Sequence, residues 1–142
     1  MTLERYIRPV VEAALGTSVI EAARVMREKR VGCLVVVREG RPVGVVTDRD
    51  LALRVLAEGR DPRTSTVADI VTYDPIVVGV GDALETALEK MRVHGVRRLP
   101  IVSSEGKVVG VVTADDVMMS FGRGRAQLAQ GHESASDVTE SR

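Results

Sequence analysis

The chain has 142 residues, with 20 basic and 20 acidic side chains and a formal net charge of zero. Because no net charge attracts nucleic acid or an anionic membrane surface, any anion site has to be local. The apolar runs are far shorter than the roughly 20 residues of a membrane-spanning helix, and no signal-peptide pattern opens the chain. We therefore expect a cytoplasmic protein with neither a membrane nor a nucleic-acid partner.

The first predicted elements are an extended segment and an amphipathic helix. Residues 8–11 are expected to be extended, because Pro9 disfavours helical geometry in the residue before it. From Thr17 onward, apolar residues recur at helical spacing. Ser18 and Glu21 are placed as a capping box at the start of this helix.

A hairpin and a second helix follow. Residues 34–37 and 43–46 are rich in β-branched side chains and flank a turn that contains glycine, which predicts two antiparallel strands. The next helix is predicted at residues 48–58 and is expected to end at Gly59. Residues 62–66 form a polar linker.

The second half of the chain repeats this order. Its predicted elements are an extended segment at 74–78, a helix capped by Asp82 and Glu85, strands at 99–102 and 108–112, and a helix at 114–121. The polar residues 123–142 contain too little apolar surface to order themselves, so we expect a disordered tail.

The clearest sign of repetition is the pattern G-x-x-T-x-x-D, which runs from Gly44 to Asp50 and again from Gly110 to Asp116. The chain is therefore a tandem repeat with a period of about 65 residues. A lone unit of that length buries a marginal core, so we expect the two units to share one core. The predicted divisions are a first domain at 1–61, the linker at 62–66, a second domain at 67–122 and the tail at 123–142.

The motif allows two interpretations. In the first, the threonine and the aspartate of each copy form a capping box for the helix after the hairpin, which explains their spacing but not the preceding glycine or the repetition. In the second, each aspartate accepts both hydroxyls of a ribose, while the threonine and the free amides of the helix N-terminus suit a phosphate or ribose oxygen. The residues concerned are Thr47, Asp50, Thr113 and Asp116.

The order of helix, hairpin and helix, with this motif at the last junction, resembles a tandem pair of CBS domains, the cystathionine-β-synthase type module. The phrases GVVTDRDL, DPIVV and HGVRRLPIV are similar to typical members, and the resemblance extends over residues 5–121. Residues 1–16 depart from the family, because they lack the usual threonine-proline phrase. The resemblance implies an α+β fold of two helix-strand-strand-helix repeats related by a pseudo-twofold axis, a Bateman-type module.

In a CBS pair the motif holds the sugar of an adenosine compound, and the resemblance implies the same role here. It also places residues 31–33 opposite residues 96–98 across the pseudo-twofold axis. Arg97 and Arg98 would then offer forked donors to a phosphate, which makes the cleft of the second motif the better equipped; the alternative is that they are exposed strand ends. The implied adenine pocket consists of Val31, Gly32, Cys33, Val111, Pro9 and Val10.

The implied function is a non-catalytic regulatory sensor for adenine nucleotides. AMP is the best guess, because two arginines suit one compact phosphate, while ATP, ADP, NAD and S-adenosylmethionine stay open. The alternative is a protein-interaction scaffold whose clefts bind nothing. Cys33, His94 and His132 lack the neighbours of a nucleophile or a metal site, so we expect no enzyme activity, catalytic cofactor or metal. Apolar helix stripes left uncovered on a monomer predict a homodimer, and a regulated protein that the sequence does not identify is a further expected partner.

Overall fold

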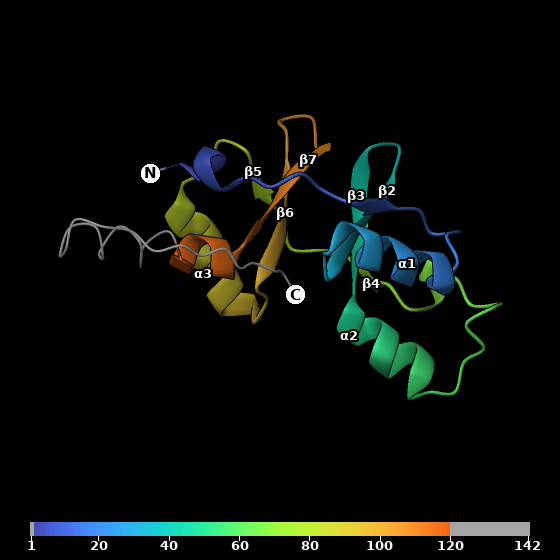
Figure 1. The fold of residues 1–142 in the computed structure, drawn as a ribbon. Helices are drawn as coiled ribbons and strands as arrows, with labels where there is room; N and C mark the ends of the chain where they lie inside the picture. Colours follow the sequence, from blue (N-terminus) through green and yellow to red (C-terminus); the bar gives the residue numbers. More distant parts are fainter. Residues whose placement is uncertain (1, 120–142) are drawn as a thin grey trace.

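The computed structural model describes residues 2–119 and contains two sheets, one in each repeat (Figure 1). The first sheet has the order β1-β2-β3-β4, in which β1 is parallel to β2 and the other neighbours are antiparallel. Its strands are β1 (Glu12–Ala13), β2 (Cys33–Arg38), β3 (Arg41–Thr47) and β4 (Thr72–Tyr73). The helices of this repeat are α1 (Val19–Lys29) and α2 (Asp48–Asp50), and α2 continues into a wider π-helical segment, η2 (Leu51–Leu56).

The second sheet has the order β5-β6-β7, with β5 parallel to β6 and a β6-β7 hairpin. Its strands are β5 (Val78–Gly79), β6 (Arg98–Val102) and β7 (Val108–Thr113). Helix α3 (Leu84–His94) precedes the hairpin, and residues 114–119 are helical after it. The predicted α+β fold of two helix-strand-strand-helix repeats is confirmed, while the predicted tail at 123–142 lies outside the described residues.

The starts of the two long helices differ. Ser18 caps α1, because its hydroxyl accepts a hydrogen bond from the backbone amide of Glu21 at 3.0 Å. This is one half of the predicted capping box; the return bond from the Glu21 side chain does not form. Helix α3 begins after Ala83, whose side chain has no acceptor. The prediction that Asp82 caps this helix is wrong, since its carboxylate accepts a hydrogen bond from the amide of Gly79 at 2.9 Å instead. Asp82 therefore closes the turn between β5 and α3.

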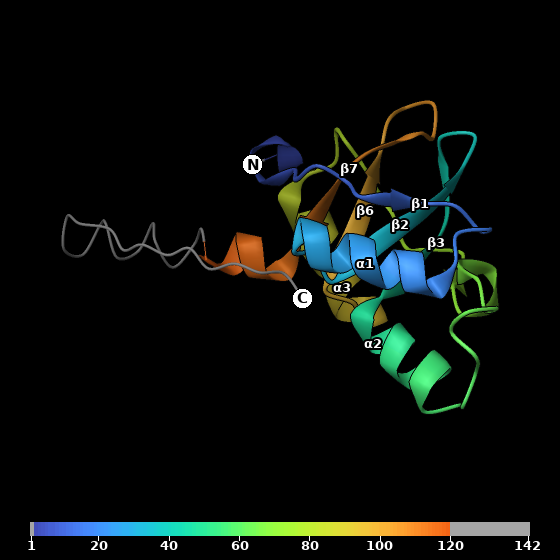
Figure 2. The same cartoon turned by 45° about the vertical axis from the view of Figure 1, so that its right-hand side comes forward.

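Each repeat is completed by a segment that precedes the other repeat in the chain. The 3₁₀ helix η1 (Leu3–Tyr6) contributes its apolar residues to the core of the second repeat, and the 3₁₀ helix η3 (Val67–Asp69) contributes to the core of the first. Figure 1 shows the N-terminal segment beside β5 and β7 before the chain crosses to the first repeat. Figure 2, turned by 45°, shows β1 at the end of this crossing. Two chain crossings thus join the repeats, one into β1 and one from β4 to β5.

The buried apolar side chains form two clusters, one in each repeat, rather than the single shared core that we predicted. The exchanged segments explain the difference, because they enlarge each core beyond what a lone repeat supplies. The first cluster contains Ala13, Val19, Ala22, Met26, Leu34, Val36, Val46, Val55, Val67, Ile70 and Val71. The second contains Leu3, Tyr6, Val78, Leu84, Ala87, Met91, Leu99, Ile101, Val112 and Val117.

The apolar stripes of α1 and α3 face these clusters, so the expectation of uncovered stripes is wrong for these two helices, although Val93 of α3 is exposed. The same expectation is confirmed for the segments that follow the hairpins, where apolar side chains are exposed. Leu53 and Leu56 are 46% and 75% exposed, and Met118 in the second repeat is 60% exposed. Among the helices of residues 2–119, none has the length and apolar character needed to span a bilayer.

The turns of the two hairpins contact each other with near symmetry. The side chain of Lys107 lies over Gly40, and the side chain of Arg41 lies over the equivalent Gly106. Both glycines have a positive φ, 80° at Gly40 and 83° at Gly106, a conformation that glycine adopts readily. This reciprocal contact places the pseudo-twofold axis between the two turns.

Candidate functional site

The first motif forms a complete capping box. Thr47 ends β3 and pairs with Cys33 at the start of β2. The Thr47 hydroxyl accepts a hydrogen bond from the amide of Asp50 at 3.1 Å, and the Asp50 carboxylate accepts one from the amide of Thr47 at 2.8 Å. The second carboxylate oxygen of Asp50 lies 3.7 Å from Nε of Arg54. Asp50 therefore serves its own helix, as the capping interpretation predicts.

The second motif differs at the aspartate. The Thr113 hydroxyl accepts a hydrogen bond from the amide of Asp116 at 3.1 Å, so the threonine still caps the helix. The Asp116 carboxylate accepts two hydrogen bonds from the guanidinium of Arg8, one from Nε and one from Nη2, the latter at 2.8 Å. The two equivalent aspartates thus have different partners, one local and one 108 residues away.

The amides at the start of each helix are partly used by the protein itself. The amide of Asp48 donates to the carbonyl of Gly32 at 3.0 Å, and the amide of Ala114 donates to the carbonyl of Arg97 at 2.8 Å. Together with the bonds to the two threonine hydroxyls, two of the first three amides of each helix are occupied. The helix N-termini therefore offer a phosphate fewer donors than expected.

The glycines that open the two motifs also serve the fold. Gly44 faces Val71 and Thr72, which lead into and form β4, and Gly110 faces Ile7 and Arg8 of the N-terminal segment. The close approach that the glycines permit is thus made by the chain itself.

Cys33 is partly buried at the start of β2, opposite Thr47. Burial raises the pKa of its thiol to about 11, although the nearby charge of Arg98 acts in the opposite direction. The charges of Asp50 and Asp48 also act on this thiol and raise its pKa further. The thiol is therefore protonated near neutral pH, as expected of a core or pocket-wall residue rather than a nucleophile.

Arg97, one of the two residues predicted to bind a phosphate, forms an ion pair with Asp115. Both side chains are well exposed, 67% for Arg97 and 64% for Asp115. Arg98 begins β6 and is half-buried, opposite Thr113 in the strand pairing. The two arginines thus lie next to the second motif, and Arg97 has Asp115 as its acidic partner.

The residues of the predicted adenine pocket fall into two groups. The backbone of Arg8 exchanges two hydrogen bonds with Val111, at 2.9 and 3.0 Å, which sets Pro9 and Val10 at the point where the chain leaves β7. The other group lies beside the first motif, at the start of β2. Its members are Val31, Gly32 and Cys33.

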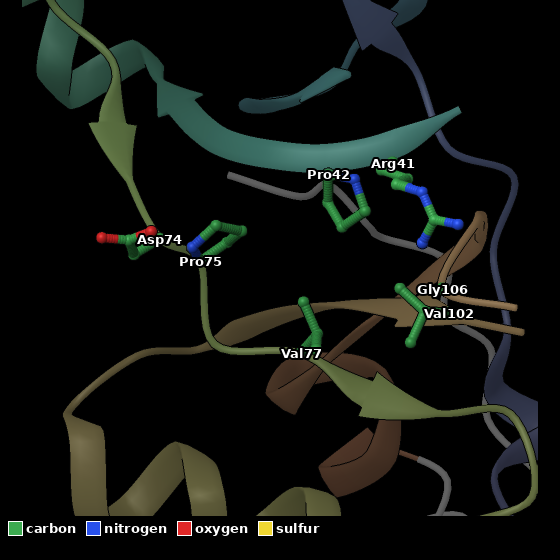
Figure 3. A pocket seen from close by; sticks show the side chains of 7 residues that line it. All are labelled: Arg41, Pro42, Asp74, Pro75, Val77, Val102 and Gly106. Carbon is green, nitrogen blue, oxygen red and sulfur yellow. The ribbon is translucent and has the colours of Figure 1, made fainter. Parts of the chain in front are cut away.

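A pocket of about 410 Å³, which the sequence did not predict, opens beside Pro42 (Figure 3). In the second hairpin, the amide of Val108 donates a hydrogen bond to the carbonyl of Gly40 at 2.9 Å. The equivalent residue of the first hairpin is Pro42, which has no amide hydrogen and cannot make the corresponding bond. The pocket lies at the beginning of β3, whereas Thr47 is the last residue of that strand, so it is separate from the motif. Its lining comes from both hairpins and the second crossing, which no local sequence pattern reveals. The lining residues are Arg41, Pro42, Asp74, Pro75, Val77, Val102 and Gly106.

Within residues 2–119, no group of three or more His, Cys, Asp or Glu side chains is arranged to hold a metal ion. His94 is the last residue of α3 and is exposed, and Gly95 ends the helix with a φ of 67°. His132 lies outside the described residues.

Two α+β repeats that exchange their leading segments and carry the same Thr–Asp motif define a paired module of the Bateman type. The chain belongs to the CBS domain family, whose family model matches residues 4–57 and 67–122.

One similar sequence is the protein MK0525 of Methanopyrus kandleri, which is 35% identical over 112 residues. The match covers 78% of this chain and 57% of MK0525, so the chain spans little more than half of that relative.

Two solved structures share the fold and contain adenosine compounds. The CBS domain protein PAE2072 from Pyrobaculum aerophilum, complexed with AMP, is 30% identical with a TM-score of 0.78, covering 92% of this chain and 98% of that one. The CBS domain pair of protein MJ0100, in complex with 5′-methylthioadenosine and S-adenosyl-L-methionine, is 27% identical with a TM-score of 0.78, covering 88% and 98%.

Proposed function

We propose that this protein is a non-catalytic regulatory sensor that binds an adenine nucleotide next to its Thr–Asp motifs, with AMP as the first candidate. The observation that carries the proposal is the Asp116 carboxylate, which binds two N–H donors side by side at the edge of the N-terminal segment. A ribose presents two adjacent hydroxyl donors, which suit the same two oxygens. The first motif would bind more weakly, because the Asp50 carboxylate is engaged by a backbone amide of its own capping box, whereas the partner of Asp116 is a half-exposed side chain.

The solved relatives support the adenosine part of this proposal. AMP, 5′-methylthioadenosine and S-adenosylmethionine share a base and a ribose and differ at the 5′ position, so a CBS pair accommodates the common part with different 5′ groups. We favour AMP for this chain because Arg97 and Arg98 lie beside the second motif. A longer phosphate chain would need more positive charge than these residues supply, since Arg97 already shares its charge with Asp115.

As a sensor, the protein would pass its signal to another chain through a changed surface, because ligand binding and partner binding are then coupled. We propose a cytoplasmic homodimer for this role, with domains at residues 1–61 and 67–122 as divided along the chain. A ligand that binds only the folded state should also raise the melting temperature.

Titration calorimetry with AMP on the wild type and on Asp116→Ala tests the ribose role. Loss of a carboxylate that accepts two hydroxyls should weaken binding by roughly 2 to 3 kcal/mol. Glu89→Ala is the matched control, because it removes an exposed carboxylate that is paired with Arg92 on α3, a helix that carries none of the predicted site residues. Unchanged affinity in a folded Asp116→Ala protein would rule out this role.

The second candidate function is an interaction scaffold with clefts that bind nothing. The capping box of Thr47 and Asp50 favours it for the first repeat, because the motif is fully explained there by helix capping. Native mass spectrometry of the purified protein separates the two functions. A bound adenosine compound supports the sensor, whereas a ligand-free protein that also gives no calorimetric signal with AMP, adenosine or S-adenosylmethionine supports the scaffold.

A further inference from the structure

The Arg8–Asp116 pair joins the N-terminal segment to the second motif. Nε and Nη2 of Arg8 donate to different oxygens of the Asp116 carboxylate, so the guanidinium binds as a fork. The Asp116 side chain is 24% exposed and the Arg8 side chain 53%. The guanidinium therefore occupies the side of the carboxylate that offers both oxygens together, and a ribose that binds on this side has to displace Arg8.

The backbone of Arg8 is held against β7, whereas half of its side chain is exposed. Its amide and carbonyl exchange hydrogen bonds with Val111, at 2.9 and 3.0 Å. The absence of a side chain on Gly110 lets the Arg8 carbonyl lie close to β7. Because half of the Arg8 side chain is exposed, the guanidinium has room to leave Asp116 while its backbone stays beside β7.

The first repeat has no counterpart of this pair. Thr72 pairs with Val45 of β3 as Arg8 pairs with Val111 of β7, so Thr72 holds the equivalent position. A threonine brings no positive charge, and Asp50 accepts its hydrogen bond from the amide of Thr47 instead. The forked contact is thus a feature of the second repeat.

On the basis of the proposed function, we infer that Arg8 selects adenosine compounds with an anionic 5′ group. The ribose takes the Asp116 carboxylate, and the released guanidinium binds the 5′ phosphate of the same ligand. Arg8 thereby exchanges one oxyanion partner for another, and the phosphate accepts the same forked donors that the carboxylate accepted.

The selection follows from the guanidinium charge of Arg8, which loses its acidic partner when the ligand takes Asp116. A neutral nucleoside at Asp116 breaks the ion pair and gives Arg8 no new acidic partner. A cationic 5′ group, such as a sulfonium, adds repulsion between like charges. Arg97 does not depend on the ligand for an acidic partner, because its charge stays paired with Asp115.

Calorimetry with AMP and adenosine on the wild type, Arg8→Gln and Arg8→Lys tests the inference. The relevant site is the one whose AMP affinity falls in Asp116→Ala. The wild type should prefer AMP. In Arg8→Gln the ratio of the AMP affinity to the adenosine affinity should fall about tenfold, because AMP loses a charged partner while adenosine no longer competes with a guanidinium. Arg8→Lys keeps the charge and should retain most of the preference. Arg92→Gln is the control, since it breaks an exposed ion pair with Glu89 on α3 and should leave both affinities unchanged.

An unchanged ratio in Arg8→Gln overturns the inference and leaves the proposed function intact, since AMP still binds. An equal loss of both ligands in Arg8→Gln and Arg8→Lys also overturns it, because Arg8 would then act only by holding the N-terminal segment. If neither the wild type nor Arg8→Gln binds either compound, the proposed function and the inference fail together.

Discussion

The Cγ2 atom of Val71 lies 2.5 Å from the position that a side-chain carbon on Gly44 would occupy. The carbonyl oxygen of Thr72 lies 2.6 Å from the same position. Atoms that are not bonded do not approach so closely, so the contact between β3 and β4 requires glycine here. The glycine of the first motif therefore allows the segment that leads to the second repeat to lie against the first sheet.

We expect Gly44→Ala to lower the free energy of unfolding by about 1 to 3 kcal/mol, as in other overpacked sites. Gly110→Ala should also lower it, because an added carbon would lie 2.4 Å from Cγ2 of Ile7. The loss should be smaller than in Gly44→Ala, since the nearest carbonyl oxygen, that of Arg8, lies 3.0 Å away rather than 2.6 Å. Gly16→Ala is the control, since nothing lies within 4 Å of its added carbon. Urea unfolding measures all three. Equal stabilities for Gly44→Ala and Gly16→Ala would mean that β4 moves away without loss.

The different partners of Asp50 and Asp116 predict different effects on stability. Asp50→Ala removes a capping-box carboxylate and should lower the free energy of unfolding by about 1 kcal/mol. Asp116→Ala breaks an exposed ion pair with Arg8 and should lower it by less than about 0.5 kcal/mol. Thermal and urea unfolding of the two variants side by side provide the measurement. A larger loss in Asp116→Ala would show that the Arg8 pair holds the repeats together.

The sequence predicted the elements that depend on neighbouring residues. Helical spacing identified α1 and α3, and short segments rich in β-branched residues around a glycine-containing turn identified both hairpins. The Ser18 cap was found from a residue three positions away. The failed cap at Asp82 has a local cause as well. Its carboxylate had a competing donor in the amide of Gly79, and spacing alone does not show which donor is nearer.

The features that sequence reasoning missed depend on distant residues. Leu3 and Tyr6 pack in the second repeat although they precede the first, because the fold exchanges these segments. The same exchange brings Arg8 to Asp116 across 108 positions of the chain. The family resemblance indicated that the N-terminal segment lines this cleft, but it did not indicate that an arginine occupies the carboxylate.

The raised pKa of Cys33 predicts a pH dependence of stability. At pH values between about 9 and 11 the thiol of the unfolded chain loses its proton while the folded thiol keeps it. The free energy of unfolding should therefore fall as pH rises through this range, by up to about 1.4 kcal/mol per pH unit. Cys33→Ala lacks this contribution, so the stability of the wild type relative to Cys33→Ala should decrease from pH 8 to pH 11. Parallel pH profiles for the two proteins would contradict the burial of the thiol.

The exposed apolar residues of η2 predict where two chains meet. Leu53 and Leu56 are three positions apart and are 46% and 75% exposed, which is unusual for leucines unless a partner covers them. A twofold contact through this segment would bury the same side chains from both chains.

We expect light scattering at low micromolar concentration to give about twice the chain mass for the wild type. The double variant Leu53→Glu with Leu56→Glu should give the mass of a single chain, because burying unpaired carboxylates opposes association. Val109→Glu changes an apolar residue of β7 that is 45% exposed, and it should leave the dimer intact. A monomeric wild type, or a dimer that survives the double substitution, would exclude this contact.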